Sequence, residues 1–322
     1  MSISVKHSPV LVSPPTAQAP AKTAEDASPL ETLASPLQPK RSRWSVLRTL
    51  RPIHWGLLAI LLGIVVAAIF APVIAPHDPT KNNLLVRLTP PAWLEGGSTE
   101  HLLGTDQLGR DLLSRIIHGA RVSLIIASAG TLLGAALGAL FGLLAGYSKG
   151  WLDNVVMLLV DAYIALPFII IALSVIAVLG SSFAVITFLA VIAGFAGYTR
   201  VTRGLALQIS EQQYVLAARS LGASRWRIIL RHALPNLMAP LIVLATMEMS
   251  SIILMEASLS FLGFGIQPPT PAWGLMVNEG RDYLNTAWWV GVFPGGAIMI
   301  LASAISLMGD WLRDVLDPTS SG

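Results

Sequence analysis

Long apolar stretches separated by short polar segments dominate this chain. A spanning helix needs about 20 mostly apolar residues to cross about 30 Å of hydrocarbon. Six stretches meet or nearly meet that length: 55–74, 122–147, 155–179, 183–201, 237–259 and 288–308. Their acidic residues are Asp161, Glu248 and Glu256, and Arg200 near the end of the fourth stretch is expected to snorkel to the interface. The pattern predicts an all-α integral membrane protein with six transmembrane helices.

Composition supports this fold class and divides the chain in two. Only 12% of the residues are charged, against about 25% in soluble globular proteins. The absence of cysteine excludes a disulfide scaffold and cysteine-ligated metal sites. Residues 1–45, rich in Pro, Ala, Ser and Thr, are predicted to be a disordered tail because they cannot bury enough apolar surface to offset chain entropy. Residues 46–322 are expected to form the transmembrane domain.

The distribution of Lys and Arg predicts the orientation of the spans. With the N-terminus in the cytoplasm, thirteen Lys and Arg residues flank the spans on the inside and six on the outside. Cytoplasmic flanks carry the excess of positive residues in membrane proteins. Both termini are therefore expected in the cytoplasm.

Glycines recur every four residues in the second span. They are Gly130, Gly134, Gly138, Gly142 and Gly146. A stripe without side chains lets another helix approach closely. The partner is either another helix of the same subunit or a second membrane subunit, and the pattern leaves both open.

The loop 204–236 is too polar to cross the membrane and has its own helical pattern. Ser210, with Gln213 three residues later, predicts the start of a helix over 211–221. Gly222 is suited to the left-handed position after that helix. Ser224 is expected to cap a second helix over 225–234, which Pro235 would end.

Three interpretations fit a helix, a glycine turn and a second helix with a basic face. A helix-turn-helix DNA reader has this local shape, but spans on both sides hold the loop against the membrane, so nucleic acid is not expected as a partner. A solvated amphipathic connector is the plainest interpretation. The third is a docking element in which Ala217, Ala218, Gly222 and Ala223 allow close approach of a cytoplasmic protein.

A resemblance favours the docking element. Residues 214–236, YVLAARSLGASRWRIILRHALPN, resemble the EAA loop of bacterial ABC importer permeases. Ala217, Ala218, Gly222, Leu234 and Pro235 match that pattern, whereas Leu216 stands where the family has Glu. Further segments at 90–124, 256–274 and 307–318 resemble the dipeptide, oligopeptide and nickel importer branch, most of all the C-type permeases of dipeptide transporters.

This resemblance implies the type I ABC importer permease fold with a cytoplasmic helix-turn-helix coupling loop, in the inner membrane of a bacterium. The chain would form half of a pathway for dipeptides or short peptides, together with a homologous second permease subunit. Two cytoplasmic ATPase subunits would bind ATP and Mg, and an extracytoplasmic substrate-binding protein would dock outside. This chain contains no Gly-x-x-x-x-Gly-Lys-Ser/Thr motif, so it is expected to be a non-enzymatic subunit that binds no cofactor or metal, surrounded by membrane lipid.

The outer loop 77–121 is too long for a plain connection. Asp111 is suited to cap a helix over 112–118 lying at the membrane surface. Asp106, Arg110 and Asp111 are candidate contacts for the binding protein, and the alternative is a structural plug that supports the spans.

The acids within the spans are candidates for the translocation pathway. A charge inside a membrane costs at least about 2.5–3.5 kcal/mol on insertion scales, so it usually serves a function. Asp161 lies in the third span, before Pro167 as a possible kink. Glu248 and Glu256 are eight residues apart and so lie within about 80° of each other on a helix. Contact with substrate and an internal hydrogen bond are both open for Glu248, and a structural or gating role is favoured for Glu256.

Other function classes leave features of the chain unexplained. A proton-coupled secondary transporter would use the intramembrane acids, but paired broken repeats are absent from the pattern. An intramembrane hydrolase needs a nucleophile and a base, and all six histidines lie outside the six stretches. A nickel or longer-oligopeptide importer remains the nearest alternative substrate class.

Overall fold

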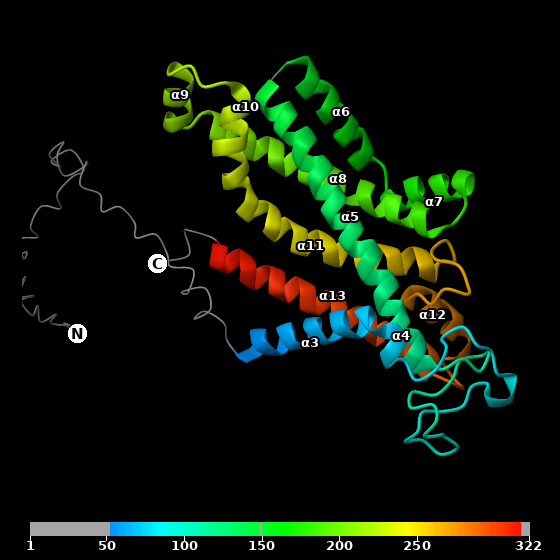
Figure 1. The fold of residues 1–322 in the computed structure, drawn as a ribbon. Coiled ribbons are helices and arrows are strands. Elements are labelled where there is room, and N and C mark those ends of the chain that lie inside the picture. The colour runs from blue at the N-terminus through cyan, green and yellow to red at the C-terminus, as the bar shows by residue number, and fades with distance from the viewer. Residues whose placement is uncertain (1–51, 149, 317–322) are drawn as a thin grey trace, which may run out of the picture. The chain divides into compact units, whose positions relative to one another are not determined.

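The computed structural model of this protein describes residues 52–148 and 150–316. These residues belong to one compact unit. The predicted tail, 1–45, lies outside the described residues. Helices form nearly all of the described secondary structure (Figure 1), and the only strand-like pairing there is an isolated antiparallel bridge between Thr105 and Asp111.

The first span is formed by two helices in succession. Helix α3 covers Pro52–Ile69 and α4 covers Ala71–Ile74. Ala68 is the single buried residue of α3, so most of this helix faces outward. In Figure 1, α3 lies beside α13 and its C-terminal end meets α4 close to the start of α5.

The second span is longer than its apolar stretch. Helix α5 runs from Leu112 to Ser148, which is 37 residues or about 55 Å. It exceeds the bilayer core of about 30 Å. The prediction of a separate surface helix over 112–118 is therefore wrong. That segment is the first part of α5 and continues directly into the span.

The third apolar stretch does not form one straight span. It consists of α6, Trp151–Ala165, and α7, Phe168–Leu179, bent by 93° at Leu166 and Pro167. Proline has no N–H to donate and disfavours a helical conformation in the residue before it, which explains the break. Five described helices are long and apolar enough to cross a membrane, and the bent pair raises the number to six.

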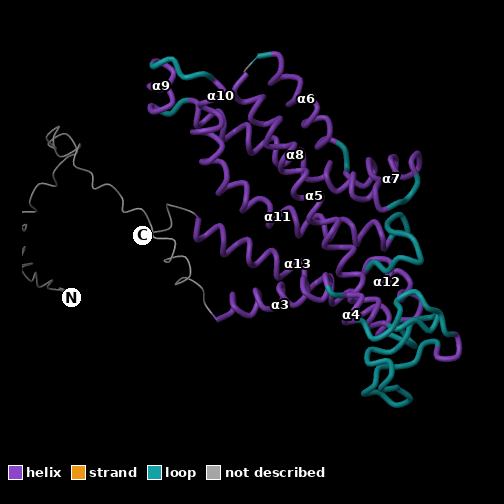
Figure 2. Tube along the Cα trace, viewed as in Figure 1, coloured by secondary structure: helices purple, strands orange, loops and turns teal. Residues whose placement is uncertain are grey.

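The remaining spans extend beyond their predicted ends. Helix α8 covers Phe183–Ser210, α11 covers Leu234–Phe261 and α13 covers Trp289–Leu316. The short helices α9, Gln213–Ser220, and α10, Arg225–Ile228, connect α8 to α11, and α12, Trp273–Gly280, lies between α11 and α13. Loops gather at the end of the unit that holds α4 and α12, and again around α9 (Figure 2).

The glycine stripe of α5 packs against α8 of the same chain. An added Cβ at Gly130 would lie 2.7 Å from Ala190 Cβ, and one at Gly142 would lie 2.6 Å from the Thr199 carbonyl oxygen. Gly134, Gly138 and Gly146 face α8 in the same way. The stripe is therefore an internal seam, which decides between the two partners that the sequence left open.

Two groups of buried residues hold the helices together. The larger group joins α5, α8, α11, α12 and α13 and includes Trp273 and Trp289. The smaller group joins the C-terminal end of α5 to α8, α9 and the start of α11, through Tyr147, Tyr198 and Val215. This second core anchors the loop between α8 and α11 to three long helices.

Candidate functional site

The loop between α8 and α11 forms a compact hairpin around Gly222. After α9, the Gly222 N–H donates to the Arg219 carbonyl (2.9 Å) and the Ala223 N–H donates to the Ala218 carbonyl (3.0 Å). This pair of bonds is a Schellman motif, in which the first residue after the helix end, here Gly222, takes a left-handed conformation. Gly222 has φ +82°, so its predicted left-handed conformation is confirmed.

The start of the first loop helix differs from the prediction. Ser210 is the last residue of α8, and its Oγ donates to the Leu207 carbonyl rather than capping the next helix. Helix α9 begins at Gln213 without a side-chain cap. The expected capping box is therefore wrong, because α8 continues further than its apolar stretch.

The second loop helix does not end at Pro235. Ser224 does cap it, because its carbonyl accepts from the Ile228 N–H (3.1 Å) and its Oγ accepts from the Arg227 N–H (3.4 Å). From α10 the chain passes through a π-helical turn, Ile229–Ala233, directly into α11. The wider π turn accommodates the ring of Pro235, which has no N–H to donate to the preceding turn. The predicted helix end at Pro235 is therefore wrong, and the second loop helix is joined to α11 as one continuous helical segment.

This hairpin, residues 211–236, has a buried root and an exposed tip. Val215 is fully buried in the second core, whereas Leu216 is 48% and Leu221 is 89% exposed. Among the residues predicted to form the docking element, Ala217, Gly222 and Pro235 are exposed, and Ala218, Ala223 and Leu234 are half-buried. Small or apolar side chains on the tip of a firmly held loop form a surface suited to docking.

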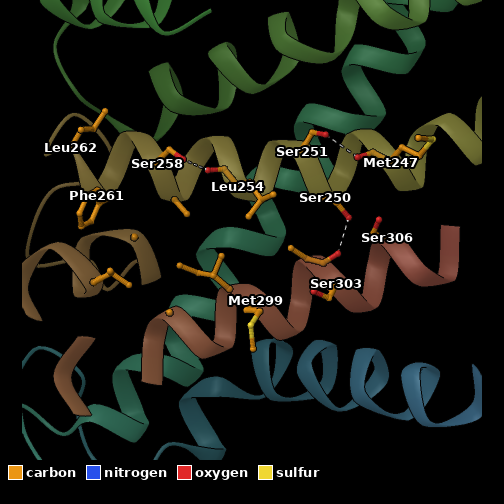
Figure 3. A pocket seen from close by; sticks show the side chains of 16 residues that line it. Met247, Ser250, Ser251, Leu254, Ser258, Phe261, Leu262, Met299, Ser303 and Ser306 are labelled. Carbon is orange, nitrogen blue, oxygen red and sulfur yellow. Dashed lines mark hydrogen bonds between the residues drawn. The ribbon is translucent and has the colours of Figure 1, made fainter. Parts of the chain in front are cut away.

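A groove with serine hydroxyls lies between α11, α12 and α13. It has a volume of about 860 Å³ and is lined by Met247, Ser251, Leu254, Ser258, Met299 and Ser303, among others. Figure 3 shows that these side chains come from α11 and α13.

Three serine hydroxyls of this groove donate to backbone carbonyls. Ser251 donates to Met247 (3.2 Å), Ser258 to Leu254 (2.6 Å) and Ser250 to Ala302 (3.0 Å), as Figure 3 draws. Each hydroxyl oxygen keeps lone pairs that can accept from another donor. The groove therefore offers hydrogen-bond acceptors on an otherwise apolar surface.

The three intramembrane acids lie outside the lining of this groove. Asp161 pairs with Arg200 of α8 (2.6 Å), so Arg200 has a partner instead of reaching alone to the interface. Glu256 is buried and accepts from Ser123 of α5 (3.2 Å) and Ser260 (2.8 Å). Its position ties α5 to α11, in line with the structural role favoured for it.

Glu248 is half-buried against α8. Its Oε1 lies 3.0 Å from the position that a Cβ on Gly197 would take. Glycine at 197 therefore allows the carboxylate to approach the backbone of α8. Glu248 lies against Gly197 of α8, whereas Glu256 is bonded to Ser123 of α5. That both acids face one lumen stays a prediction.

The predicted docking residues of the outer loop are buried. Asp106, Arg110 and Asp111 are each at most 3% exposed. Asp106 binds Arg110 (2.6 Å) and also Arg115 of α5, and both arginines bind Glu279 of α12 (3.1 and 2.9 Å). These side chains hold the loop together and are not on its surface, so their expected role as direct docking contacts is wrong in this structure.

The sequence alone does not predict which residues pair in this ion-pair cluster. Arg110 and Glu279 are 169 residues apart, and no local pattern links them. Asp111 does act as a helix cap, as predicted, because its Oδ2 accepts from the N–H (2.8 Å) and the Oγ (2.7 Å) of Ser114. The helix that it caps is α5.

Comparison with known families matches most of the chain. Residues 138–321 match the family described as "Binding-protein-dependent transport system inner membrane component". Residues 54–91 match "N-terminal TM domain of oligopeptide transport permease C".

Curated relatives are similar over most of their length. The di/tripeptide transport system permease protein DppC of Pseudomonas aeruginosa is 47% identical, over 82% of this chain and 86% of the relative. The dipeptide transport system permease proteins DppC of Haemophilus influenzae and Escherichia coli K12 are 40% and 41% identical, each over 88% of this chain and over 96% and 94% of the relatives.

Among solved structures, a chain of the inward-facing MetNI methionine ABC transporter has the same fold. The TM-score is 0.51 at 18% identity, over 63% of this chain and 96% of that chain. At this identity the likeness shows the fold alone, and it confirms the predicted ABC importer permease fold.

Proposed function

The chain belongs to the binding-protein-dependent transport system inner membrane components, and from this we propose that it forms half of the pathway of an ATP-driven importer for dipeptides or short peptides. The names of relatives at 40–47% identity support the substrate class. The second half of the pathway is a homologous permease subunit. Two ATPase subunits bind ATP and Mg on the cytoplasmic side.

The hairpin 211–236 carries this proposal. Its exposed tip at Leu221 presents an apolar surface to an ATPase subunit, and its root at Val215 is fixed among α5, α8 and α11. Because the second half of the hairpin, from Arg225 on, continues into α11 without a break, a displacement of this half moves α11 as well. The serine-bearing groove is lined in part by α11, so the second half of the hairpin and the groove share one continuous helical segment.

The groove is this subunit's contribution to the substrate pathway. A dipeptide carries N–H and ammonium donors, and the groove's serine oxygens accept such donors without binding a side chain tightly. A transported substrate must also leave, so weak and distributed contacts suit this task. Glu248, Asp161 and Glu256 lie outside the lining, and we assign them to support of the pathway walls.

Orientation follows from the Lys and Arg distribution. The hairpin lies on the cytoplasmic side with both termini, and the loops around α4 and α12 face outward. The binding protein then docks on the exposed part of the outer loop, where Leu85 and Trp93 are exposed. The buried cluster of Asp106 and Arg110 keeps that surface in shape.

A transport assay tests the proposed function. The chain is reconstituted in liposomes with its second permease subunit, both ATPase subunits and a binding protein, and labelled dipeptide uptake is followed. We expect uptake to require ATP and binding protein and to be unaffected by a protonophore. Uptake without ATPase subunits, or uptake abolished by the protonophore, would identify a proton-coupled transporter instead.

A pair of variants tests the docking surface itself. Leu221→Asp places a charge on the exposed tip of the hairpin, and Leu85→Asp places the same charge on a similarly exposed leucine of the outer loop. We expect Leu221→Asp to lower co-purification of the ATPase subunits and Leu85→Asp to leave it unchanged. Equal retention of ATPase subunits by both variants would refute the docking role of the tip.

A further inference from the structure

Two imidazoles and a carboxylate converge beside the first turn of α5. Asp111 Oδ1 lies 3.0 Å from His101 Nδ1 and 3.7 Å from His77 Nδ1. The two rings have centroids 4.8 Å apart, and one ligand atom from each residue fits within 4.8 Å of the others. His77 follows α4, His101 lies in the outer loop and Asp111 caps α5, so three separate segments meet here.

The carboxylate is held with one oxygen turned to the histidines. Asp111 Oδ2 accepts from both the N–H and the Oγ of Ser114. The Ser114 Oγ in turn accepts from the His77 backbone N–H (3.0 Å). Outer hydrogen bonds of this kind fix the orientation of metal ligands. Oδ1 is left to face both imidazoles.

Only one of the two imidazoles has a hydrogen-bond partner for its Nδ1 in the described structure. His101 Nδ1 is within hydrogen-bond distance of Asp111 Oδ1. His77 Nδ1 is buried and has no hydrogen-bond partner among the described residues. A buried polar atom without a partner costs free energy, and this one points at an oxygen that it does not reach.

Neighbouring charges leave Asp111 available. Arg110 and Arg115, the nearest arginines in the sequence, are bound to Asp106 and Glu279. Neither arginine is paired with Asp111 in the described structure. The contacts that Asp111 Oδ1 makes in the described structure are therefore with the two histidines.

We propose that His77, His101 and Asp111 bind a divalent transition metal ion of the zinc class. Bonds of about 2.0–2.1 Å to nitrogen and oxygen in a tetrahedron place ligand atoms about 3.3 Å apart. The separations of 3.0 and 3.7 Å lie on either side of that value. Imidazole and carboxylate are ligands that zinc accepts, and three protein ligands leave a fourth position for water.

The bound ion ties the outer loop to the transmembrane unit. It links the exit of the first span at His77 to the start of α5 at Asp111, and it fixes His101 between them. Closing these chain segments by a metal clip restricts the loop's conformations. The site thus stiffens the loop that carries the exposed residues Leu85 and Trp93.

Zinc binding to the assembled permease complex tests this site. The full-length chain, co-purified with its partner subunits through a tag without histidines, is stripped with a chelator and titrated with Zn²⁺ against a chromophoric competitor. His77→Ala is the main variant, because its ring is one-third exposed and makes no side-chain hydrogen bond. His118→Ala is the matched control, since His118 lies on α5 close by and is bonded to the Ser114 carbonyl.

We expect wild type and His118→Ala to bind one more Zn²⁺ per chain than His77→Ala, with at least a tenfold loss of affinity in that variant. Removing His101 by His101→Ala is expected to have the same effect. Zn²⁺ should also raise the unfolding temperature of wild type and His118→Ala only. Equal zinc stoichiometry and affinity in wild type, His77→Ala and His101→Ala would overturn the proposal.

Discussion

A single methyl group added to the seam between α5 and α8 should separate the two helices. In Gly138→Ala the new Cβ would lie 2.5 Å from Tyr198 Cβ, 2.8 Å from the Phe195 carbonyl oxygen and 3.0 Å from the Thr199 nitrogen. Two of these atoms belong to the backbone of α8, so no rotamer change removes the contact. The helices must move apart or bend.

The expected free-energy change combines two opposing terms. Overpacking of a close-packed site costs about 1–3 kcal/mol, and rigid backbone atoms place Gly138→Ala in the upper part of that range. Alanine gains up to about 1 kcal/mol over glycine in a helix. The net result is a destabilisation of about 1–2 kcal/mol, with the loss spread along the seam because α8 moves as a unit.

Gly204 provides a matched control within α8. A Cβ at Gly204 meets nothing within 4 Å, so Gly204→Ala keeps the helix-propensity gain without the clash. Unfolding of both purified variants in detergent, followed by circular dichroism or by thermal aggregation, should separate them by about 2–3 kcal/mol. Gly138→Ala is expected below wild type and Gly204→Ala at or slightly above it.

Equal stability of the two alanine variants would refute this reasoning. It would show that α5 and α8 are further apart than the seam requires, or that the helices slide freely to accept the methyl group. A larger side chain extends the test: Gly138→Leu should prevent assembly of the complex, whereas the seam hypothesis fails if that variant keeps its subunits and its transport rate.

Three further outcomes follow from other parts of the structure. Gly222→Val forces a β-branched residue to φ +82°, which costs about 1–2 kcal/mol. Reconstituted complexes with this variant should hydrolyse ATP without the usual dependence on loaded binding protein and should lose peptide uptake. Normal coupling of ATP hydrolysis to uptake would exclude the hairpin as the transmission element. Glu279→Ala leaves Arg110 and Arg115 buried with one partner fewer and should lower stability by about 3–5 kcal/mol, while Asp282→Asn, at an exposed pair with Arg281, should leave thermal unfolding unchanged. Cysteines introduced singly by Thr99→Cys and Ser224→Cys into this cysteine-free chain should react with impermeant reagents from opposite sides of the membrane, and labelling of both from outside would contradict the assigned orientation.

Features encoded within a few consecutive residues could be predicted. Hydropathy located all six apolar stretches because spanning depends on the local content of apolar side chains. The left-handed Gly222, the cap at Ser224 and the cap at Asp111 were also correct. Each of these depends on backbone geometry within about one helical turn, so neighbouring residues specify it.

Helix ends were harder to predict than helix cores. Helix α5 starts at Leu112 and α8 continues to Ser210, beyond the apolar stretches. Polar residues outside the bilayer still form helix when they pack against neighbouring elements. Pro235 was read as a stop because a proline interrupts an ordinary α-helix, but a π turn before it lets α11 continue from the hairpin.

Contacts between distant residues were decided only by the tertiary structure. The sequence showed a stripe of glycines, and the fold placed α8 against it. It showed acids and arginines in the outer loop, and the fold buried them with Glu279 of α12. The sequence placed His77, His101 and Asp111 in one loop, and the fold brought their side chains together. Local patterns determine which segments are helical and apolar, whereas the pairing of side chains across many residues depends on how closely packed helices bring their faces together.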